Sequence, residues 1–187
     1  MITGQSGAGK GTLIKRLLDL FPQLELAVSA TTRDRRPGEV DGVHYYFISD
    51  EEFDRRLAAD DFLEYHVFPW GQRSGTLLSE IDRIAEQGKV CVLELETEGA
   101  LRVVDRIPDA VTIFVTAPIE ELDRRLRERD TESAGEIGER LRVAREQLEV
   151  ADRFDFRVEN HDLDRALGEL SELVRRYAVP AGTMPRP

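Results

Sequence analysis

The stretch Gly4-Gln5-Ser6-Gly7-Ala8-Gly9-Lys10-Gly11-Thr12 decides the fold of this chain. It matches the pattern G-x-x-x-x-G-K in full, and it stands between the strand-like Ile2-Thr3 and a run of apolar residues with helical spacing. In such a loop, backbone N–H groups converge on polyphosphate oxygens, the following helix adds its positive N-terminal end, and the lysine reaches the β- and γ-phosphates. The sequence therefore predicts a phosphate-binding loop at residues 4–12.

The end of this loop departs from the usual pattern, because Gly11 stands where a Ser or Thr hydroxyl normally ligates Mg²⁺. Thr12 follows directly, so we expect Mg²⁺ to be held mainly by phosphates, water and Thr12. Only three residues precede the loop, whereas a leading strand normally has about five. The sequence leaves open whether the central strand is short or whether the natural start lies upstream.

Length and composition are those of one globular domain with inserted subregions, since the chain has 187 residues, 41% hydrophobic and 34% charged. No apolar run approaches the roughly 20 residues that span a bilayer, and no secretory signal is recognisable, so we expect a cytoplasmic protein without a membrane partner. The net charge of −11 argues against a general nucleic-acid binder, which needs clustered Lys and Arg. The oligomeric state is not indicated.

Strand-like apolar segments alternate with helical segments along the chain. This alternation predicts an α/β fold of three layers, a central parallel sheet with helices on both faces and ligands at the carboxyl ends of the strands. We expect strands at 24–30, 44–48, 62–68, 89–95, 110–116 and 156–159, with 89–95 in the centre of the sheet. The expected helices are 10–20, 49–59 (opened by a capping box at Ser49), 76–87, 98–107, 119–129, 136–151 and 163–177.

Two segments break this alternation and are expected to be inserts. Residues 31–75 hold short strands and one helix, so they form a subdomain between core segments 1–30 and 76–178. Within the second core segment, the Arg-rich helices of 119–146 meet at a polar, Gly-containing hinge that suits a lid. The Pro-rich end, residues 179–187, is predicted to be disordered.

A second anion site is predicted in the segment Ser29-Ala30-Thr31-Thr32-Arg33-Asp34-Arg35-Arg36-Pro37-Gly38-Glu39 and the nearby Tyr45. Arg33 and Arg36 can each present a planar fork to one phosphate, and the Tyr45 hydroxyl completes the set. Taken alone, this segment is equally compatible with a solvated charge run beside a turn. The presence of a phosphate loop in the same chain favours the anion site.

Together with Phe62-Leu63-Glu64-Tyr65, Glu94-Leu95-Glu96 and Gly99, these motifs resemble the guanylate kinases over almost the whole chain. The resemblance implies a P-loop nucleoside-monophosphate kinase that transfers the γ-phosphoryl group of ATP to GMP, giving GDP and ADP, with Mg²⁺ as cofactor. No general base is needed, because the acceptor is already a phosphate oxygen. Whether dGMP is also a substrate stays open.

The resemblance also implies roles for individual residues. Those that grip the GMP phosphate are Arg33, Arg36 and Tyr45, and those that recognise guanine are Ser29, Glu64 and Glu96. A carboxylate such as Glu64 can accept from guanine N1–H and N2–H₂ together, and adenine lacks that donor edge. Catalysis falls to Lys10, Arg36, Arg125, Arg129 and Arg140, further GMP contacts to Arg73, Ser74 and Thr76, and Mg²⁺ binding to Thr12 and Glu94, partly through water.

The chain departs from the family at three of these positions. Members usually carry Asp where this chain has Glu94 and Glu96. Many have Tyr-Gly-Thr or Tyr-Gly-Ser in place of Ser74-Gly75-Thr76, and that tyrosine contacts the GMP phosphate. Ser74 is too short to replace it, so we hypothesise that Arg73 supplies the missing contact.

Two other interpretations are compatible with parts of the sequence. One is a kinase of the same fold that acts on another nucleoside monophosphate or a sugar phosphate. Ser29 and Glu64 favour guanine over these substrates. The other is an inactive guanylate-kinase-like module that binds peptides. Such modules typically lose the phosphate loop, whereas Lys10, Arg33 and Arg36 remain here.

Overall fold

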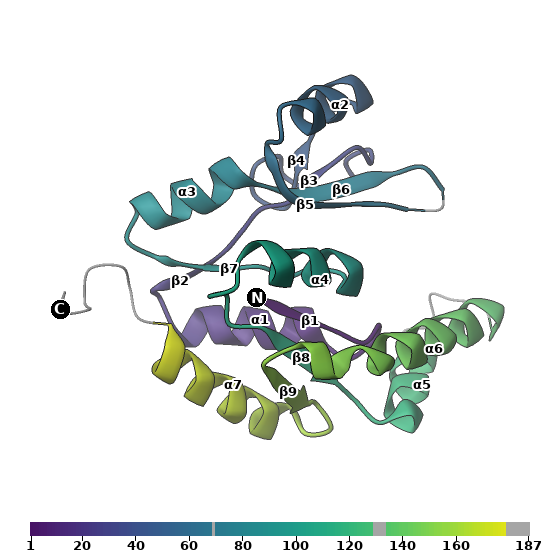
Figure 1. The fold of residues 1–187 in the computed structure, drawn as a ribbon. Helices are drawn as coiled ribbons and strands as arrows, with labels where there is room; N and C mark the ends of the chain where they lie inside the picture. Colours follow the sequence, from purple (N-terminus) through teal and green to yellow (C-terminus); the bar gives the residue numbers. More distant parts are fainter. Residues whose placement is uncertain (69, 129–133, 179–187) are drawn as a thin grey trace.

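The computed structural model describes residues 1–68, 70–128 and 134–178, and its core is a parallel sheet in the strand order β2-β7-β1-β8-β9 (Figure 1). The two halves of this order join where Ile2 pairs with Glu94 and its N–H donates to the Leu93 carbonyl at 2.8 Å. The strands are β1 (Ile2–Gly4), β2 (Leu24–Leu26), β7 (Val90–Val92), β8 (Ile113–Thr116) and β9 (Phe156–Glu159). The expected parallel sheet is confirmed, but its middle strand is the short β1 rather than β7.

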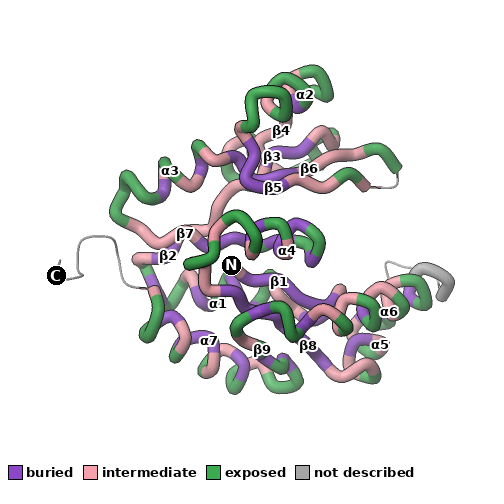
Figure 2. Tube along the Cα trace, viewed as in Figure 1, coloured by how far each residue is buried: buried purple, intermediate pink, exposed green. Residues whose placement is uncertain are grey.

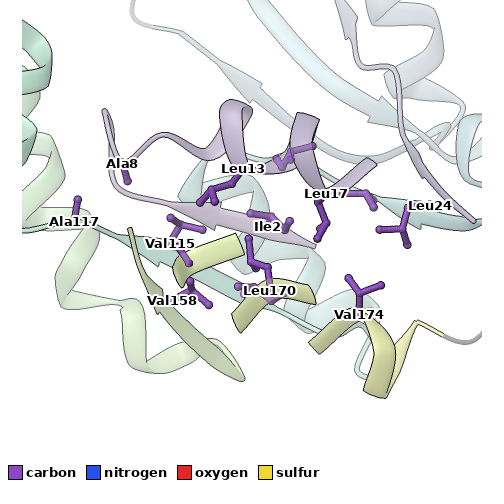
Figure 3. Packing of buried hydrophobic residues seen from close by; sticks show 14 of the residues in the cluster. Ile2, Ala8, Leu13, Leu17, Leu24, Val115, Ala117, Val158, Leu170 and Val174 are labelled. Atoms are coloured by element: carbon purple, nitrogen blue, oxygen red, sulfur yellow. The ribbon is translucent and has the colours of Figure 1, made fainter. Parts of the chain in front are cut away.

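Helices cover both faces of this sheet, as the sequence predicts. Ile113 and Val115 of β8 pack with α1 and α7, while Phe114 between them packs on the other side with α3 and α4. This alternation is the period of a strand that is buried on both faces. Figure 2 shows the buried strands β1 and β8 between the helices. Figure 3 shows the cluster of buried residues on the α1 and α7 side, with Ile2 near Leu17 and Leu170. The helices are α1 (Lys10–Leu20), α3 (Leu78–Glu86), α4 (Thr97–Arg106) and α7 (Leu163–Tyr177).

A second sheet lies beside the core, with strand order β4-β3-β6-β5 and the helix α2 packed on it (Figure 1). Phe53 of α2 stacks on Phe62 with ring centroids 4.4 Å apart, and the Ser49 side chain caps α2 by accepting from the Glu52 N–H, as predicted. The elements are β3 (Ala30–Thr31), β4 (Tyr46–Phe47), α2 (Asp50–Ala58), β5 (Phe62–Val67) and β6 (Arg73–Leu77). The sheet therefore spans 30–77, two residues beyond the expected end of the insert.

Two predicted elements were wrong in detail. The strand expected at 24–30 is divided between β2 in the core and β3 in the second sheet. The strand β6 was not predicted, and residues 76–77 belong to it rather than to a helix. Arg73-Ser74-Gly75-Thr76 has no apolar alternation, and β6 forms because β3 and β5 pair with it on both sides.

The Arg-rich segment folds as α5 (Ile119–Glu128) and α6 (Ala134–Glu149), followed by the short η1 (Ala151–Arg153). Leu122 and Ala144 of this pair lie in the main core cluster, so the bases of both helices are packed against the core. The predicted disordered tail, 179–187, lies outside the described residues. None of the described helices is both long and apolar enough to cross a membrane.

The phosphate loop is fixed to this framework by the buried side chain of Gln5, which is 1% exposed. Its Oε1 accepts from the Ala117 N–H at 2.9 Å, and its Nε2 donates to the Ala144 carbonyl at 3.1 Å. One amide therefore joins the loop to the end of β8 and to α6. Both backbone groups would lose their partner without it.

We predict that Gln5→Ala lowers the free energy of unfolding by about 2–4 kcal/mol, because two buried backbone groups lose their hydrogen bonds. Urea unfolding of the pure protein measures this. Gln72→Ala in the β5–β6 turn is the control, since it removes one exposed hydrogen bond with Trp70 and should cost less than about 1 kcal/mol. Equal losses for the two variants would contradict the structural role of Gln5.

Candidate active site

The phosphate loop begins with a close approach of two backbones and ends at an open helix terminus. Gly4 has φ +141°, and a Cβ there would overlap the carbonyl oxygen of Val115. Gly9 has φ +83° and precedes α1, and no side chain caps the first N–H groups of that helix. These N–H groups are therefore left for an anion at the positive end of the helix.

Lys10 stands in the first turn of α1, and its side chain folds back under the loop. Its Nζ donates to the Gly4 carbonyl at 2.8 Å and to the Gln5 carbonyl at 3.2 Å. Burial lowers the pKa of Lys10, while the charges of Glu96 and Glu94 act in the opposite direction. The ammonium group is thus held beside two carboxylates at the carboxyl end of β7.

Two cavities meet at these three charged residues. The first, about 470 Å³, is lined by Ser6, Gly7, Gly9, Lys10, Gly11, Thr12, Glu94, Glu96 and Arg140. The second, about 310 Å³, is lined by Lys10, Leu26, Ala27, Ser29, His44, Tyr45, Glu64, His66, Phe68, Ser74, Glu94, Leu95 and Glu96. Lys10, Glu94 and Glu96 line both, so they mark the boundary between a cavity at the phosphate loop and one at the second sheet.

Glu64 in β5 is the most buried acid of the second cavity, at 7% exposure. Its Oε1 accepts from the Thr76 N–H at 3.0 Å and from the Thr76 hydroxyl at 2.9 Å. Its Oε2 lies against Gly99 of α4 so closely that a Cβ there would overlap it. Burial raises the pKa of Glu64, and the two Thr76 hydrogen bonds partly oppose this shift. Thr76 and Gly99 therefore fix this carboxylate in one orientation.

The predicted GMP-phosphate residues are arranged around one ion pair. Arg33 donates through both terminal nitrogens to Glu39, at 2.8 and 3.0 Å, and its guanidinium lies 5.4 Å from the ring centre of Tyr45. The Arg33 hydrogen bonds, with one from the Arg36 N–H, lower the pKa of Glu39 to about 2. Tyr45 lines the second cavity, whereas Arg33 stands behind it and Arg36 is exposed in the adjoining loop.

Arg73 and Ser74 are neighbours in β6, and their side chains point to opposite faces of the sheet. Ser74 lines the second cavity, and its hydroxyl donates to the Ala30 carbonyl at 3.1 Å. Arg73 instead pairs with Asp50 at 2.7 Å and with Asp54, and it covers the ring of Phe53 at 4.6 Å. The hypothesis that Arg73 reaches a phosphate in the cavity does not fit this position, because alternation along the strand turns it toward α2.

The three arginines predicted to act from a lid have different positions. Arg140 lines the loop cavity. Arg125 donates to Glu121 at 2.7 Å, to the Asn160 carbonyl at 2.8 Å and to the Ala8 carbonyl at 3.4 Å, so it supports the loop from outside. Arg129 lies outside the described residues. Three other arginines of this segment pair with nearby acids on the helix surfaces: Arg124, Arg127 and Arg142.

Two residues that were not predicted from the sequence support the loop. Asn160 donates through Nδ2 to the Ala8 carbonyl at 2.7 Å, and the Ser6 N–H donates to Gln147 Oε1 at 2.8 Å. Asn160 directly follows β9, and the carboxyl ends of parallel strands meet at one edge, so its place in the chain was an available signal. Nothing in the sequence around Gln147 distinguishes it from other polar residues of a helix.

Thr12 and Glu94 are the residues that fit a magnesium ion. Both line the loop cavity, and Glu94 Oε1 lies 3.9 Å from the point where a Cβ on Gly11 would stand. Loss of hydration inside the cleft raises the pKa of Glu94, and the charge of Lys10 opposes this shift. A hydroxyl and a carboxylate are the hard oxygen donors that Mg²⁺ prefers, and it takes its remaining ligands from phosphates and water. The donor set therefore fits the ion.

Comparison with known proteins identifies the family. The family model described as "Guanylate kinase" matches residues 1–177. The chain is 46% identical to the guanylate kinase of Rubrobacter xylanophilus, over 96% of this chain and 94% of that protein. It is 43% identical to the guanylate kinase of Synechococcus elongatus, over 93% and 95%.

The fold agrees with this assignment. The crystal structure of guanylate kinase from Anaplasma phagocytophilum has a TM-score of 0.73, with 24% identity over 97% of this chain and 87% of that chain. At this identity the likeness concerns the fold. With the phosphate loop, the two cavities and the sequence matches taken together, the chain belongs to the guanylate kinase family.

Proposed function

We propose that this chain transfers the γ-phosphoryl group of ATP to GMP, giving GDP and ADP. The observation that carries the proposal is the pair of cavities that meet at Lys10, one lined by the phosphate loop and the other by Glu64. In-line phosphoryl transfer needs a donor and an acceptor phosphate face to face, with positive charge between them. The family assignment gives the same reaction.

ATP occupies the loop cavity in this proposal. The loop N–H groups and the open end of α1 bind its phosphates, and Lys10 exchanges its two backbone carbonyl partners for phosphate oxygens. Arg140 adds charge from the wall of the same cavity. Thr12 and Glu94 would hold Mg²⁺, which supplies neutralisation of phosphate charge when it is bound.

GMP occupies the cavity at the second sheet. Glu64 accepts from the guanine N1–H and N2–H₂ groups, and Ser29 and Glu96 complete the base contacts. Tyr45 binds the phosphate from the cavity wall, and Arg33 behind it adds positive charge. AMP would leave the buried Glu64 without donors, which is the cost that excludes it. An enzyme that consumes ATP and GMP also fits the cytoplasmic location expected from the sequence.

The first test compares GMP, AMP, UMP and CMP as acceptors of ATP in a coupled assay that follows ADP. We expect strong preference for GMP in the wild type, and a loss of about 10²–10³ in kcat for Lys10→Ala, because one charged donor to the transferred group is removed. Lys15→Ala, an exposed lysine of the same helix, is the control and should keep its activity. No preference for GMP would defeat the proposal.

The pH profile tests Glu64. Protonation removes its ability to accept from both guanine donors, so kcat/KM for GMP should fall as the pH drops through the pKa of Glu64. Because burial raises that pKa, the fall should begin at a higher pH than for an exposed glutamate. Glu64→Gln should lower kcat/KM for GMP by at least about 10²-fold at neutral pH and remove this acid limb.

The thermal stability of Glu64→Gln is the control for unfolding. A carboxyl group with a raised pKa in the folded state contributes stability below that pKa and loses it as the pH rises. Glu64→Gln removes this buried charge, so the variant should keep the wild-type melting temperature at neutral pH. A large drop in melting temperature would mean that unfolding, not lost recognition, explains the activity.

Gly99→Ala tests the orientation of Glu64 without changing it. The added Cβ would overlap Glu64 Oε2, so the carboxylate must turn away and KM for GMP should rise about tenfold or more, with KM for ATP little changed. Gly168→Ala in α7 is the matched control, because a Cβ there meets nothing within 4 Å and should slightly stabilise the helix. Equal KM values for GMP in the two variants would contradict the role of Gly99.

A further inference from the structure

The second cavity lacks a donor at one of its walls. Ser74 stands where many members of the family have a tyrosine that contacts the GMP phosphate, and its only hydroxyl proton is directed to the Ala30 carbonyl. Arg73, the neighbour in sequence, is engaged by Asp50 and Asp54 on the opposite face. A ligand phosphate at this wall therefore needs another residue of the cavity as its donor.

His66 is the residue that lies beside Ser74. The two are paired across the antiparallel strands β5 and β6, so their side chains are neighbours on one face. Glu64 and His66 of β5, and Phe68 directly after the strand, are spaced two residues apart, and all three line the cavity. His66 is two residues beyond Glu64, or about 6.6 Å along the strand. This spacing carries His66 away from the guanine end of the cavity.

The imidazole of His66 is held from two sides. Its Nδ1 lies 3.1 Å from Glu98 Oε2 in the first turn of α4, and Phe68 meets the ring edge-on at 4.7 Å between centroids. The side chain is 23% exposed. Among the residues that the structure describes, Nε2 has no hydrogen-bond partner. A carboxylate that engages one ring nitrogen orients the ring and leaves the other nitrogen for a ligand.

We propose that His66 Nε2 donates a hydrogen bond to the phosphate group of GMP and so replaces the tyrosine hydroxyl that Ser74 cannot supply. This inference rests on the proposed function, since it assigns a further residue to the same acceptor site. With Glu98 on Nδ1 and a phosphate oxygen on Nε2, both nitrogens act as donors, which is the protonated form of the ring. Glu98 acts as a positioning residue through His66.

Removing the phosphate from the ligand gives the sharpest test. We expect His66→Ala to raise KM for GMP by about tenfold to hundredfold, with a smaller change in kcat, because a hydrogen bond to a charged group is lost. The inhibition constant of guanosine, which has no phosphate, should stay at the wild-type value. A residue that only supports the fold would weaken both ligands alike.

Two further variants separate packing from donation. His66→Leu fills the space against Phe68 but has no donor, so it should give the same loss for GMP. His66→Gln retains a donor and should recover part of the affinity. His161→Ala, at an exposed histidine in the turn after β9, is the matched control and should behave as wild type.

The outcomes are distinct. A wild-type protein that does not phosphorylate GMP defeats the proposed function itself. If the wild type does so, an unchanged KM for GMP in both His66→Ala and His66→Leu overturns this inference alone. Equal weakening of GMP and guanosine also overturns it. Selective weakening of GMP, with partial recovery in His66→Gln, supports it.

Discussion

The contact between Gly4 and Val115 is the constraint on which the rest of the site depends. The chain leaves β1 so close to β8 that no side chain fits, and one residue later the amide of Gln5 joins the loop to β8 and α6. The position of the phosphate loop depends on this close contact between the β1 and β8 backbones. Gly9 can open α1 toward the cavity, and Lys10 can fold back under the loop, only because the preceding backbone is fixed.

Local arrangement of charge explains how a chain with net charge −11 can bind two anionic nucleotides. The positive groups are few, and each is held by nearby oxygen atoms: Lys10 by the Gly4 and Gln5 carbonyls, Arg33 by Glu39, and Arg125 by Glu121. Such hydrogen bonds hold a long side chain in one position before the ligand arrives, which reduces the conformational entropy lost on binding. Polyphosphate then meets donors that are already ordered.

The features that could be predicted from the sequence depend on neighbouring residues in the chain. The features that were missed depend on contacts between segments distant in sequence. Spacing and capping placed 10–20, Ser49 and 156–159 correctly, because helix periodicity, an N-cap and an apolar run act within a few residues. The strand β6 depends on partners more than 40 residues away at β3 and was missed. The fit of Gly99 against Glu64, and the orientation of Arg73 toward α2, likewise arise from packing between distant segments.

The acceptor cavity lies between two sheets, so its precision depends on how firmly they are joined. Helix α4 fastens β5 to the core, because Arg106 donates to the carbonyls of Phe62 and Leu63 and Arg102 donates to that of Tyr65. On the other side, the buried Glu80 of α3 accepts from the Val28 N–H and from the Tyr46 hydroxyl. Glu64 lies in β5 of the second sheet and Glu96 stands at the start of α4 beyond the core strand β7, so the proposed contact of both acids with one base requires both connections to hold. Recognition of the acceptor is therefore a property of the joint between the sheets as much as of the residues that touch the nucleotide.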